Sequence, residues 1–245
     1  MSPLELALLT TVALFAGTVD AVAGGGGLIT LPALLAAGLP EHVALGTNKG
    51  QSVWGSGVAL IAFWRGGHVD RKQALVSFPL GLIGSLVGAQ LVLLISKDAL
   101  RPIVIALLIG AAIVLVARRP AQGERPVRRW LAALLALGIG CYDGFFGPGT
   151  GTFLIVGFVA LCGRTLLQAT ADAKVVNFAS NLAAVAAFAH GGHVMWSVAV
   201  PMAIGQLIGG MIGARLAIKR GAKLIRALVV TVSGALVVKL VLDLV

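Results

Sequence analysis

The sequence predicts an all-α polytopic membrane protein with two inverted-topology repeats of helices and about eight to ten membrane segments. Three features of the chain indicate this fold. First, 58% of its 245 residues are hydrophobic and 11% are charged, whereas soluble domains average about 45–50% and 25%. Second, apolar segments follow one another with only short loops between them. Third, the second half of the chain repeats the first, including its glycine-rich segment.

Apolar segments lie on either side of an Arg-rich linker. Those of the first half are 4–22, 28–39, 50–64, 74–95 and 103–117, and those of the second half are 130–141, 150–162, 175–189, 194–218 and 224–244. In each half, two short segments flank a glycine-rich break, and three fuller spans follow. We therefore divide the chain into a first membrane repeat (1–117), a cytoplasmic Arg-rich linker (118–129) and a second membrane repeat (130–245).

The internal duplication appears at a fixed offset of 125 residues. With this shift, 47–91 aligns with its later copy at 15 identities in 45 positions. The identities include Lys49 with Lys174, and a Gly-Gly-His-Val tetrapeptide at 66–69 that recurs at 191–194. A gap of two residues then brings the two glycine-rich segments into register, each directly after an Asp. Each copy therefore carries its own glycine break.

The distribution of charge indicates that the two copies are inverted. Loop 65–72 is basic, whereas its copy at 190–194 contains no Lys or Arg. Because cytoplasmic loops are enriched in Lys and Arg, we expect the first loop inside the cell and the second outside. The Arg-rich linker then also lies inside, and both termini face outward. These loops explain the net charge of +10, so we expect no nucleic-acid partner.

The segment 20–32 contains four consecutive glycines, and we expect the rest of the fold to be arranged around it. Each glycine costs about 1 kcal/mol relative to Ala in a helix interior. In a bilayer, broken backbone survives only where it is buried in protein or lines a polar cavity. We expect helices that are broken or re-entrant at 24–27 and 147–151. Hydropathy does not decide whether the segments around each break form a re-entrant hairpin or cross the membrane fully. The alternative is a glycine patch where two helices pack closely.

Ionisable and polar residues near the two breaks form the candidate binding site. Buried charges in a membrane are costly and usually functional. Thr47 and Asn48 are expected to cap a helix that begins at residue 50, so that its positive end and Lys49 attract an anion. The predicted substrate-binding residues are Gly24, Gly25, Gly26, Gly27, Thr47, Asn48, Lys49, Ser52, Gly147, Gly149, Thr150, Lys174, Asn177 and Asn181. The candidates for proton coupling are Asp20 and Asp143.

The same charges also have a purely structural interpretation. Ion pairs between Asp20 and Lys49, and between Asp143 and Lys174, would hold each break in shape. A lysine neutralised in this way would attract an anion less strongly. Asp172 has no charged counterpart in the first half and would pair with Lys174. The sequence alone does not choose between these roles.

Three motifs resemble the sulfite exporter TauE/SafE family, also called the toluene sulfonate uptake permeases. They are the glycine run after Asp20, the Gly-Thr-Asn-Lys segment at 46–49 and the repeated Gly-Gly-His-Val. The pentapeptide Gly-Gly-His-Val-Asp at 66–70 is the motif most specific to this family. The resemblance covers almost the whole chain. It implies a multi-pass carrier of the bacterial inner membrane that moves sulfite, sulfoacetate or other organosulfonates. The second half departs from the pattern at 171–174, which keeps the lysine but loses the Thr-Asn pair.

We therefore predict a secondary transporter for a small anion, such as sulfite or sulfoacetate, working by alternating access at a midplane site between the repeats. We expect no enzyme activity, no cofactor and no metal. The expected partners are a small anionic solute, the lipid bilayer, and H⁺ or Na⁺ as a coupling ion, and a homo-oligomer is compatible with the sequence. Two alternatives stay open: an anion channel, and an intramembrane aspartyl protease that uses Asp20 and Asp143 as paired carboxylates.

Overall fold

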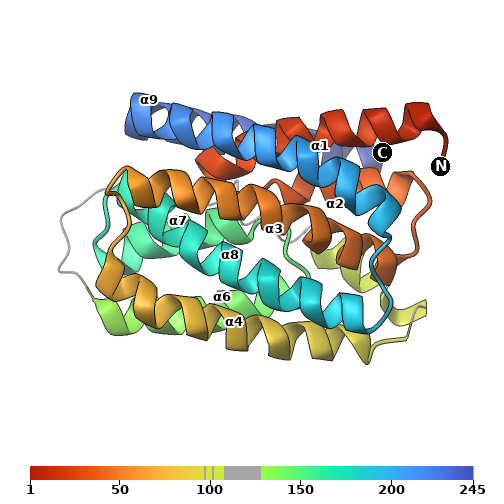
Figure 1. Cartoon of the computed structure of the whole chain (residues 1–245), viewed down its shortest axis with the longest axis horizontal. Helices are drawn as coiled ribbons and strands as arrows, with labels where there is room; N and C mark the ends of the chain where they lie inside the picture. The colour runs from red at the N-terminus through yellow and green to blue at the C-terminus, as the bar shows by residue number, and fades with distance from the viewer. Residues whose placement is uncertain (97, 101, 108–127, 245) are drawn as a thin grey trace.

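The chain folds into a bundle of α-helices (Figure 1). The computed structural model describes residues 1–96, 98–100, 102–107 and 128–244, with side chains as far as residue 220, and these residues contain no β-strand. The helices are α1 (Pro3–Ala23), α2 (Gly27–Ala36), α3 (Glu41–Arg65), α4 (Arg71–Leu93), α6 (Arg129–Phe145), α7 (Thr150–Cys162), α8 (Leu166–His190) and α9 (Trp196–Leu244). Pro3–Ala23, Arg71–Leu93 and Trp196–Arg220 are long and apolar enough to cross a membrane. The predicted all-α membrane fold is confirmed.

Helix boundaries differ from the predicted segments at three places. α8 begins at Leu166 instead of residue 175. α3 begins at Glu41 instead of residue 50, because hydropathy does not detect the polar first turns of a helix that is buried in protein. The last two predicted segments, 194–218 and 224–244, both lie within α9. The segment 103–117 and the linker 118–129 lie largely outside the described residues, so the proposed division of the chain at this linker stays a prediction.

Both predicted glycine breaks are present. Short glycine segments separate α1 from α2 and α6 from α7. The backbone is left-handed at Gly24, Gly25, Gly147 and Gly149, where φ is 75°, 88°, 99° and 89°. Residues with a Cβ rarely adopt these values, whereas glycine does so without steric cost. The glycines therefore turn the chain sharply, which a simple packing patch would not require.

The two breaks are the tips of helical hairpins that meet inside the molecule. The backbone at Gly151 packs so closely on Gly24 that a Cβ on Gly24 would overlap it. α2 has 10 residues and α7 has 13, which gives lengths of about 15 and 20 Å. Arg129 at the start of α6 and Arg164 just after α7 both approach Asp70. The α6–α7 hairpin therefore starts and finishes at one end of the molecule.

The helices form two groups that do not coincide with the two halves of the chain. α1, α2 and α3 pack together with α9, whereas α6, α7 and α8 pack together with α4. Each half thus contributes one helix to the group formed by the other half. The two groups meet mainly along α3 and α8, whose chains run in opposite directions (Figure 1). Between the described helices, the chain passes from one group to the other at 66–70 and at 191–195.

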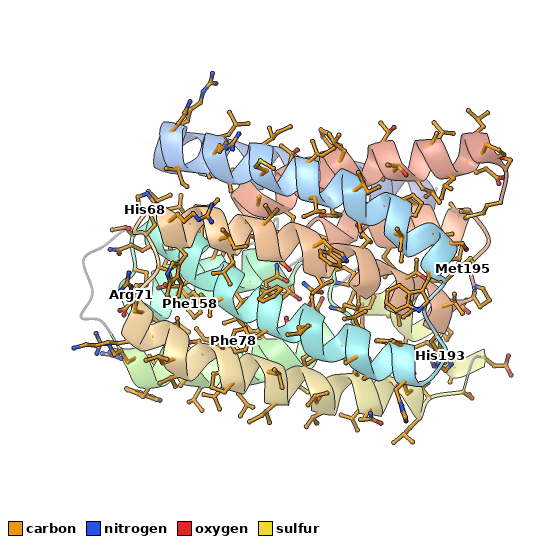
Figure 2. The ribbon with its side chains drawn as sticks, in the orientation of Figure 1. His68, Arg71, Phe78, Phe158, His193 and Met195 are labelled. Carbon is orange, nitrogen blue, oxygen red and sulfur yellow. The ribbon has the colours of Figure 1, made fainter. Side chains whose placement is uncertain are left out.

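The structure repeats individual contacts at the offset of 125 residues. The backbone N–H of Asp70 donates to Oδ1 of Asp172 over 3.0 Å, and that of Met195 donates to Oγ1 of Thr47 over 3.0 Å. Asp70 corresponds to Met195, and Asp172 to Thr47. The two loops lie at opposite ends of the molecule, as the labels of His68 and Met195 show (Figure 2). These contacts fit the predicted duplication, while the inverted orientation of the repeats in a membrane stays a prediction.

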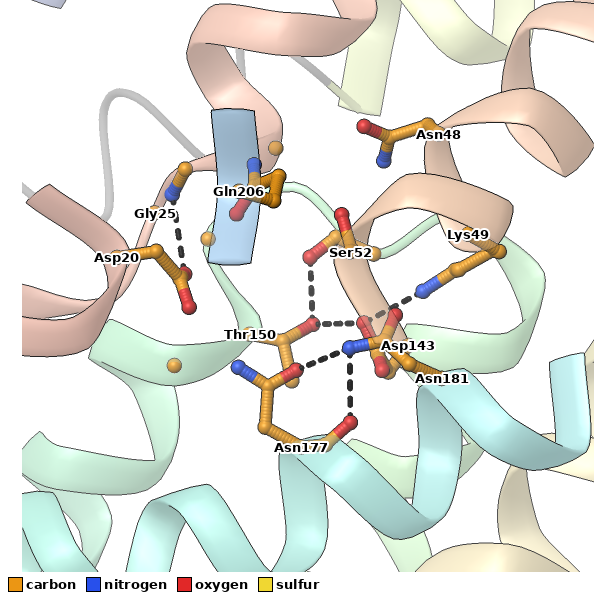
Figure 3. Close-up of a pocket in the computed structure, with 15 residues that line it drawn as sticks. Asp20, Gly25, Asn48, Lys49, Ser52, Asp143, Thr150, Asn177, Asn181 and Gln206 are labelled. Atoms are coloured by element: carbon orange, nitrogen blue, oxygen red, sulfur yellow. Dashed lines mark hydrogen bonds and ion pairs between the residues drawn. The ribbon is translucent and has the colours of Figure 1, made fainter. Parts of the chain in front are cut away.

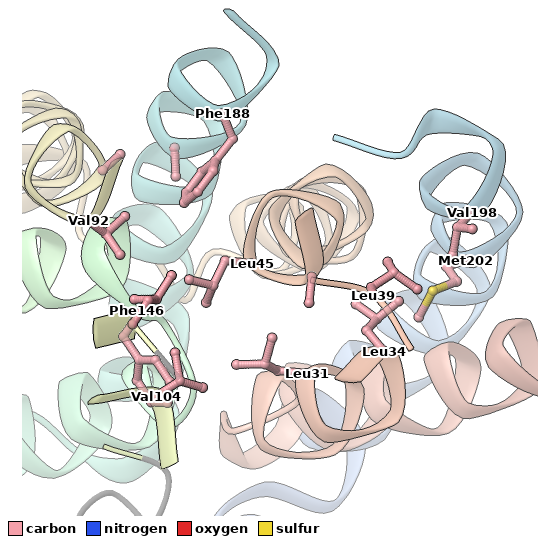
Figure 4. Close-up of a cluster of buried hydrophobic side chains, with 14 of the residues drawn as sticks. Leu31, Leu34, Leu39, Leu45, Val92, Val104, Phe146, Phe188, Val198 and Met202 are labelled. Atoms are coloured by element: carbon pink, nitrogen blue, oxygen red, sulfur yellow. The ribbon is translucent and has the colours of Figure 1, made fainter. Parts of the chain in front are cut away.

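An apolar cluster anchors the first hairpin beside the polar interior. Leu31 and Leu34 of α2 are fully buried and belong to the same cluster as Leu45 of α3, Phe188 of α8 and Met202 of α9 (Figure 4). In a membrane such packing gains from close van der Waals contact, because lipid tails are as apolar as the side chains themselves. α2 itself packs on α1 and α3, and its glycine N-terminus lines the polar cavity at the centre.

Candidate functional site

A polar cavity lies where the two hairpin tips meet (Figure 3). Its lining residues are Asp20, Gly25, Gly26, Gly27, Asn48, Lys49, Ser52, Asp143, Gly147, Gly149, Thr150, Gly151, Asn177, Asn181 and Gln206. The volume open to the centres of water molecules is about 20 Å³, which is room for one or two waters. Most residues predicted as the site are therefore brought together, although they come from six different helices and two breaks.

Three predicted site residues lie outside this lining. Thr47 is buried in the middle of α3, where its hydroxyl accepts the N–H of Met195. The predicted N-cap role of Thr47 and Asn48 is wrong, because α3 begins upstream with Pro40 as its N-cap. Gly24 packs against the second hairpin tip instead of facing the cavity. Lys174, the third, is buried behind the cavity in an ion pair.

The N-termini of two helices point into the cavity. α2 begins at Gly27 and α7 at Thr150, and both residues line the cavity together with their N-caps, Gly26 and Gly149. The first N–H groups of a helix have no partner within the helix, and the helix dipole gives this end a partial positive charge. Two such ends on one cavity favour a negative solute. This role falls to α2 and α7, in place of the predicted helix at residue 50.

The side-chain amide of Asn48 is oriented as a donor toward the first break. Its Oδ1 accepts the hydroxyl of Thr30 over 2.6 Å and the amide of Gln51 over 2.9 Å. The oxygen is therefore occupied, and Nδ2 lies toward Gly27, where a Cβ would be 3.6 Å away. Asn48 consequently offers N–H groups beside the N-terminus of α2.

The amide of Asn177 is oriented in the same way beside the second break. Its Oδ1 accepts the amide of Asn181 over 2.8 Å, and the same amide also donates to the Asn177 carbonyl over 2.8 Å. Nδ2 of Asn177 lies toward Gly151, at 3.6 Å from the position of a Cβ there. Each helix N-terminus thus has one amide NH₂ group next to it. A cavity lined by such donors suits an acceptor-rich anion.

Two buried ion pairs flank the cavity, and each joins one half of the chain to the other. Nζ of Lys49 donates to Oδ1 of Asp143 over 2.8 Å, and Nζ of Lys174 donates to Oδ2 of Asp20 over 2.8 Å. The predicted pairing of each Asp with the Lys of its own half is therefore wrong. The reason is that Lys49 on α3 and Lys174 on α8 lie where the two helix groups meet, so each lysine reaches the Asp beside the break of the other half. Two carboxylates and two ammonium groups leave the cluster neutral.

Among the described residues, the carboxylate of Asp143 is held by side chains only. Its Oδ1 also accepts the hydroxyl of Thr150 over 2.8 Å, and its Oδ2 accepts the hydroxyl of Ser180. Asp143 is 2% exposed. Buried carboxylates need several donors to offset the cost of desolvation. Lys49, Thr150 and Ser180 supply them from α3, α7 and α8.

Asp172 belongs to a separate cluster at one end of the molecule. Its expected partner was Lys174, but the structure pairs it with Nε of Arg164 over 3.2 Å. Arg164 also donates to Asp70 over 2.5 Å, and Asp70 caps α4 through the N–H groups of Lys72 and Gln73. Partial burial raises the pKa of Asp70, but the hydrogen bond from Arg164 and that from the Gln73 N–H outweigh it. The pKa of this carboxyl consequently lies below its ordinary value of 3.8.

Gln206 and Gly151 line the cavity without having been predicted as site residues. Gln206 extends from α9 between α1 and α3, where a Cβ on Gly17 would come within 2.8 Å of its Oε1. The sequence does contain a pattern that could have predicted Gln206 as a site residue, because it is a polar residue isolated in the apolar segment 194–218. Its counterpart in the first half is Gly81, so a search for repeated polar pairs passes over it. Within the described part of the chain, no three His, Cys, Asp or Glu side chains gather as a metal site.

Comparison with known proteins identifies the family. The family model described as "Sulfite exporter TauE/SafE" matches residues 9–240. The chain is 42% identical to the "Probable membrane transporter protein ORF9" of Sinorhizobium sp over 243 residues, covering 97% of this chain and 93% of that protein. It is 42% identical over 250 residues to the "Probable membrane transporter protein YfcA" of Escherichia coli K12, covering 99% and 92%.

A more distant relative also spans most of both chains. The "Probable membrane transporter protein YdhB" of Bacillus subtilis is 24% identical over 200 residues, which cover 79% of this chain and 82% of that protein. No solved structure matches the chain. The family match over nearly the full length agrees with the polytopic helical fold and the resemblance of the motifs. The chain therefore belongs to the sulfite exporter TauE/SafE family and is a membrane transporter, not an enzyme.

Proposed function

We propose that this protein is a secondary transporter for a small anion, a sulfur oxyanion or organosulfonate such as sulfite or sulfoacetate. One observation carries this proposal: two helix N-termini and two oriented amide NH₂ groups converge on one buried polar cavity. These groups stabilise negative charge without a full positive charge of their own. The family description supports a sulfur oxyanion as the solute.

The neutral charge of the cluster suits a carrier. A cavity with unpaired lysines would hold an anion tightly and release it slowly, whereas Lys49 and Lys174 are each balanced by an Asp. Each Asp weakens the attraction of its lysine for the solute, and the hydrogen bonds and helix dipoles add energies that are moderate. Uptake on one side and release on the other both need such moderate affinity.

Alternating access would move the two helix groups against each other. Asp20, Lys49 and Gln206 reach the cavity from one group, and Asp143 and Asn177 reach it from the other. A space open to one or two waters is too small for a tetrahedral sulfur oxyanion. Rocking of the groups would widen it toward one side at a time, and we propose that the repeats are inverted about this site.

The loops that connect the groups are suited to act as hinges. The chain crosses between the groups at 66–70 and 191–195, and these loops contain Gly67 and Gly192 with φ of 73° and 71°. A Cβ on either glycine would have nothing within 4 Å, so no neighbour packs against the chain at the two glycines themselves. Hinges of transporters and enzymes are short loops of this kind.

The membrane potential limits the choice of coupling. Moving one charge across 100 mV changes its free energy by about 2.3 kcal/mol. Export of a dianion from a cell with a negative interior is driven by this potential, whereas uptake requires H⁺ or Na⁺ to balance the charge. We propose Asp20 and Asp143 as the carboxylates that would take such a proton. The site would lie in the inner membrane of a bacterium, with the basic loop 65–72 in the cytoplasm.

A thermal-shift screen of the purified protein tests the proposed solute class. The compounds are sulfite, sulfate, thiosulfate, sulfoacetate, taurine and small carboxylates. A ligand that binds only the folded state raises its stability by RT ln(1 + [L]/Kd), so a sulfur oxyanion or sulfonate should raise the unfolding temperature in a saturable way. Stabilisation by carboxylates alone, or by none of the compounds, would reject the proposed solute class.

A further inference from the structure

The two ion pairs beside the cavity differ in what holds them. Both are salt bridges with Nζ–Oδ distances of 2.8 Å, and their residues correspond under the duplication. Lys49 and Asp143 are both among the residues that line the cavity. Of the second pair, Asp20 lines the cavity and Lys174 does not, and the side chain of Lys174 is 0% exposed. The duplicated pairs are therefore placed differently relative to the solute.

The pair of Lys174 and Asp20 is bound to the backbone of the first break. Nζ of Lys174 also donates to the carbonyl oxygen of Asp20 over 2.5 Å, and the N–H of Gly24 donates to the same oxygen over 2.9 Å. Oδ1 of Asp20 accepts the N–H of Gly26 over 3.1 Å. These bonds tie the last turn of α1 to the first residues of the break. Displacing Lys174 would therefore remove one of the two donors to the Asp20 carbonyl and leave the carboxylate that holds Gly26 without its counter-ion, at a cost.

The pair of Lys49 and Asp143 makes no such backbone contact within the described part of the chain. Asp143 accepts from Lys49, Thr150 and Ser180, all through side chains. An ammonium group has three N–H donors, and Lys49 directs one of them to Asp143. Side chains can rotate without breaking the helices that carry them. Lys49 can consequently turn from Asp143 toward a solute in the cavity.

From these differences we infer a division of roles between the two pairs. Lys49 is the cation that contacts the transported anion, and Asp143 is the counter-ion that neutralises Lys49 while the cavity is without solute. Lys174 and Asp20 are positioning residues that hold the first break in shape. This inference rests on the proposed anion transport and names the residue that discriminates a charged solute from a neutral one.

A lysine-replacement experiment tests the division of roles. Lys49→Cys and Lys174→Cys are made separately in a background where Cys141 and Cys162 are replaced by Ala. 2-Bromoethylamine then converts an accessible cysteine into a lysine analogue with a stable thioether. We expect Lys49→Cys to react in the folded protein, to be protected by sulfoacetate, and to recover solute-induced thermal stabilisation after modification. Lys174→Cys should react only after denaturation.

Hydrogen exchange gives a second measurement that needs no solute. Lys174→Gln should speed exchange of the peptide that covers 20–32, because Asp20 and the break lose their anchor, whereas Lys49→Gln should leave this peptide unchanged. Equal exchange in the two Gln variants, or faster modification of Lys174→Cys than of Lys49→Cys, would overturn the division of roles. Neither the exchange rate nor the rate of modification without solute involves binding, so failure of the proposed function would show separately, as a wild-type protein that no sulfur anion stabilises.

Discussion

Gly147 offers the sharpest test of how the second break positions Lys49. A Cβ on Gly147 would lie 2.5 Å from Nζ of Lys49 and 3.0 Å from Oδ1 of Asp143. Both distances are shorter than an ordinary van der Waals contact, so the new Cβ of Gly147→Ala must displace the ammonium and the carboxylate from their present positions. Gly192→Ala is the matched control, because Gly192 also has a left-handed φ of 71° but open space around a Cβ.

The expected losses can be worked from these two environments. Alanine in left-handed backbone costs about 1–2 kcal/mol at either site. Gly147→Ala additionally disturbs a hydrogen bond between charged groups, which contributes about 1.5–3 kcal/mol. We therefore expect a loss of about 1–2 kcal/mol in Gly192→Ala and of about 2.5–5 kcal/mol in Gly147→Ala. If Lys49 contacts the solute, an ammonium displaced by the new Cβ also loses its hydrogen bond to the anion, which again contributes about 1.5–3 kcal/mol and lowers affinity by about tenfold to a hundredfold in Gly147→Ala.

The assay is denaturant unfolding in detergent micelles, followed by titration of each variant with the stabilising anion. Gly192→Ala should bind this anion as the wild type does. Equal free energies of unfolding in the two variants, together with unchanged affinity in Gly147→Ala, would show that the break does not position Lys49. The reasoning from the close approach of Gly147 would then be refuted.

Three further predictions concern other charged groups. Because the pKa of Asp70 is lower in the folded state, its carboxylate stabilises the fold above the ordinary pKa of 3.8 and loses this effect as the pH falls through the folded pKa. Asp70→Asn should therefore lower the unfolding temperature at neutral pH, and this difference from the wild type should vanish in acid. Replacement of an exposed carboxylate in Asp98→Asn is the control and should show no such change. Single cysteines at Asp70 and Met195, in a cysteine-free background, should react with an impermeant thiol reagent from opposite sides of the membrane, and same-side labelling would reject the inverted repeat. If transport is proton-coupled, Asp143→Asn or Asp20→Asn should keep solute counterflow but lose accumulation driven by a pH gradient, and accumulation retained in both would favour uniport export.

The parts of the fold that follow from local chemistry could be predicted from the sequence. Contiguous glycines after Asp20 specify a break, and the repeat at 125 residues places the second break after Asp143. Both breaks are present, and most of the polar residues near them do line one cavity. Hydropathy, in contrast, placed the start of α3 too late, because its polar first turns are buried by protein and not by lipid.

The pairing of the charges could not be predicted, because it depends on how the halves pack. Lys49 lies closer in sequence to Asp20 than to Asp143, yet α6 of the second half brings Asp143 to it. In the same way, Arg164 of the second half takes Asp70 of the first half as a partner, because α4 packs among the helices of the second half. No local pattern encodes such contacts. They follow from the exchange of α4 and α9 between the two helix groups.

Counterflow in proteoliposomes tests most directly whether the cavity carries a small sulfur anion. Vesicles loaded with unlabelled sulfoacetate or sulfite are diluted into a trace of the same solute carrying ³⁵S, and uptake is followed with wild-type protein and with Lys49→Met. A carrier that alternates access should show saturable uptake, accelerated by solute inside the vesicles, and Lys49→Met should abolish it in folded protein. Flux that does not saturate and ignores the solute inside would indicate a channel, and uptake by Lys49→Met at the wild-type rate would contradict the site described for this transporter.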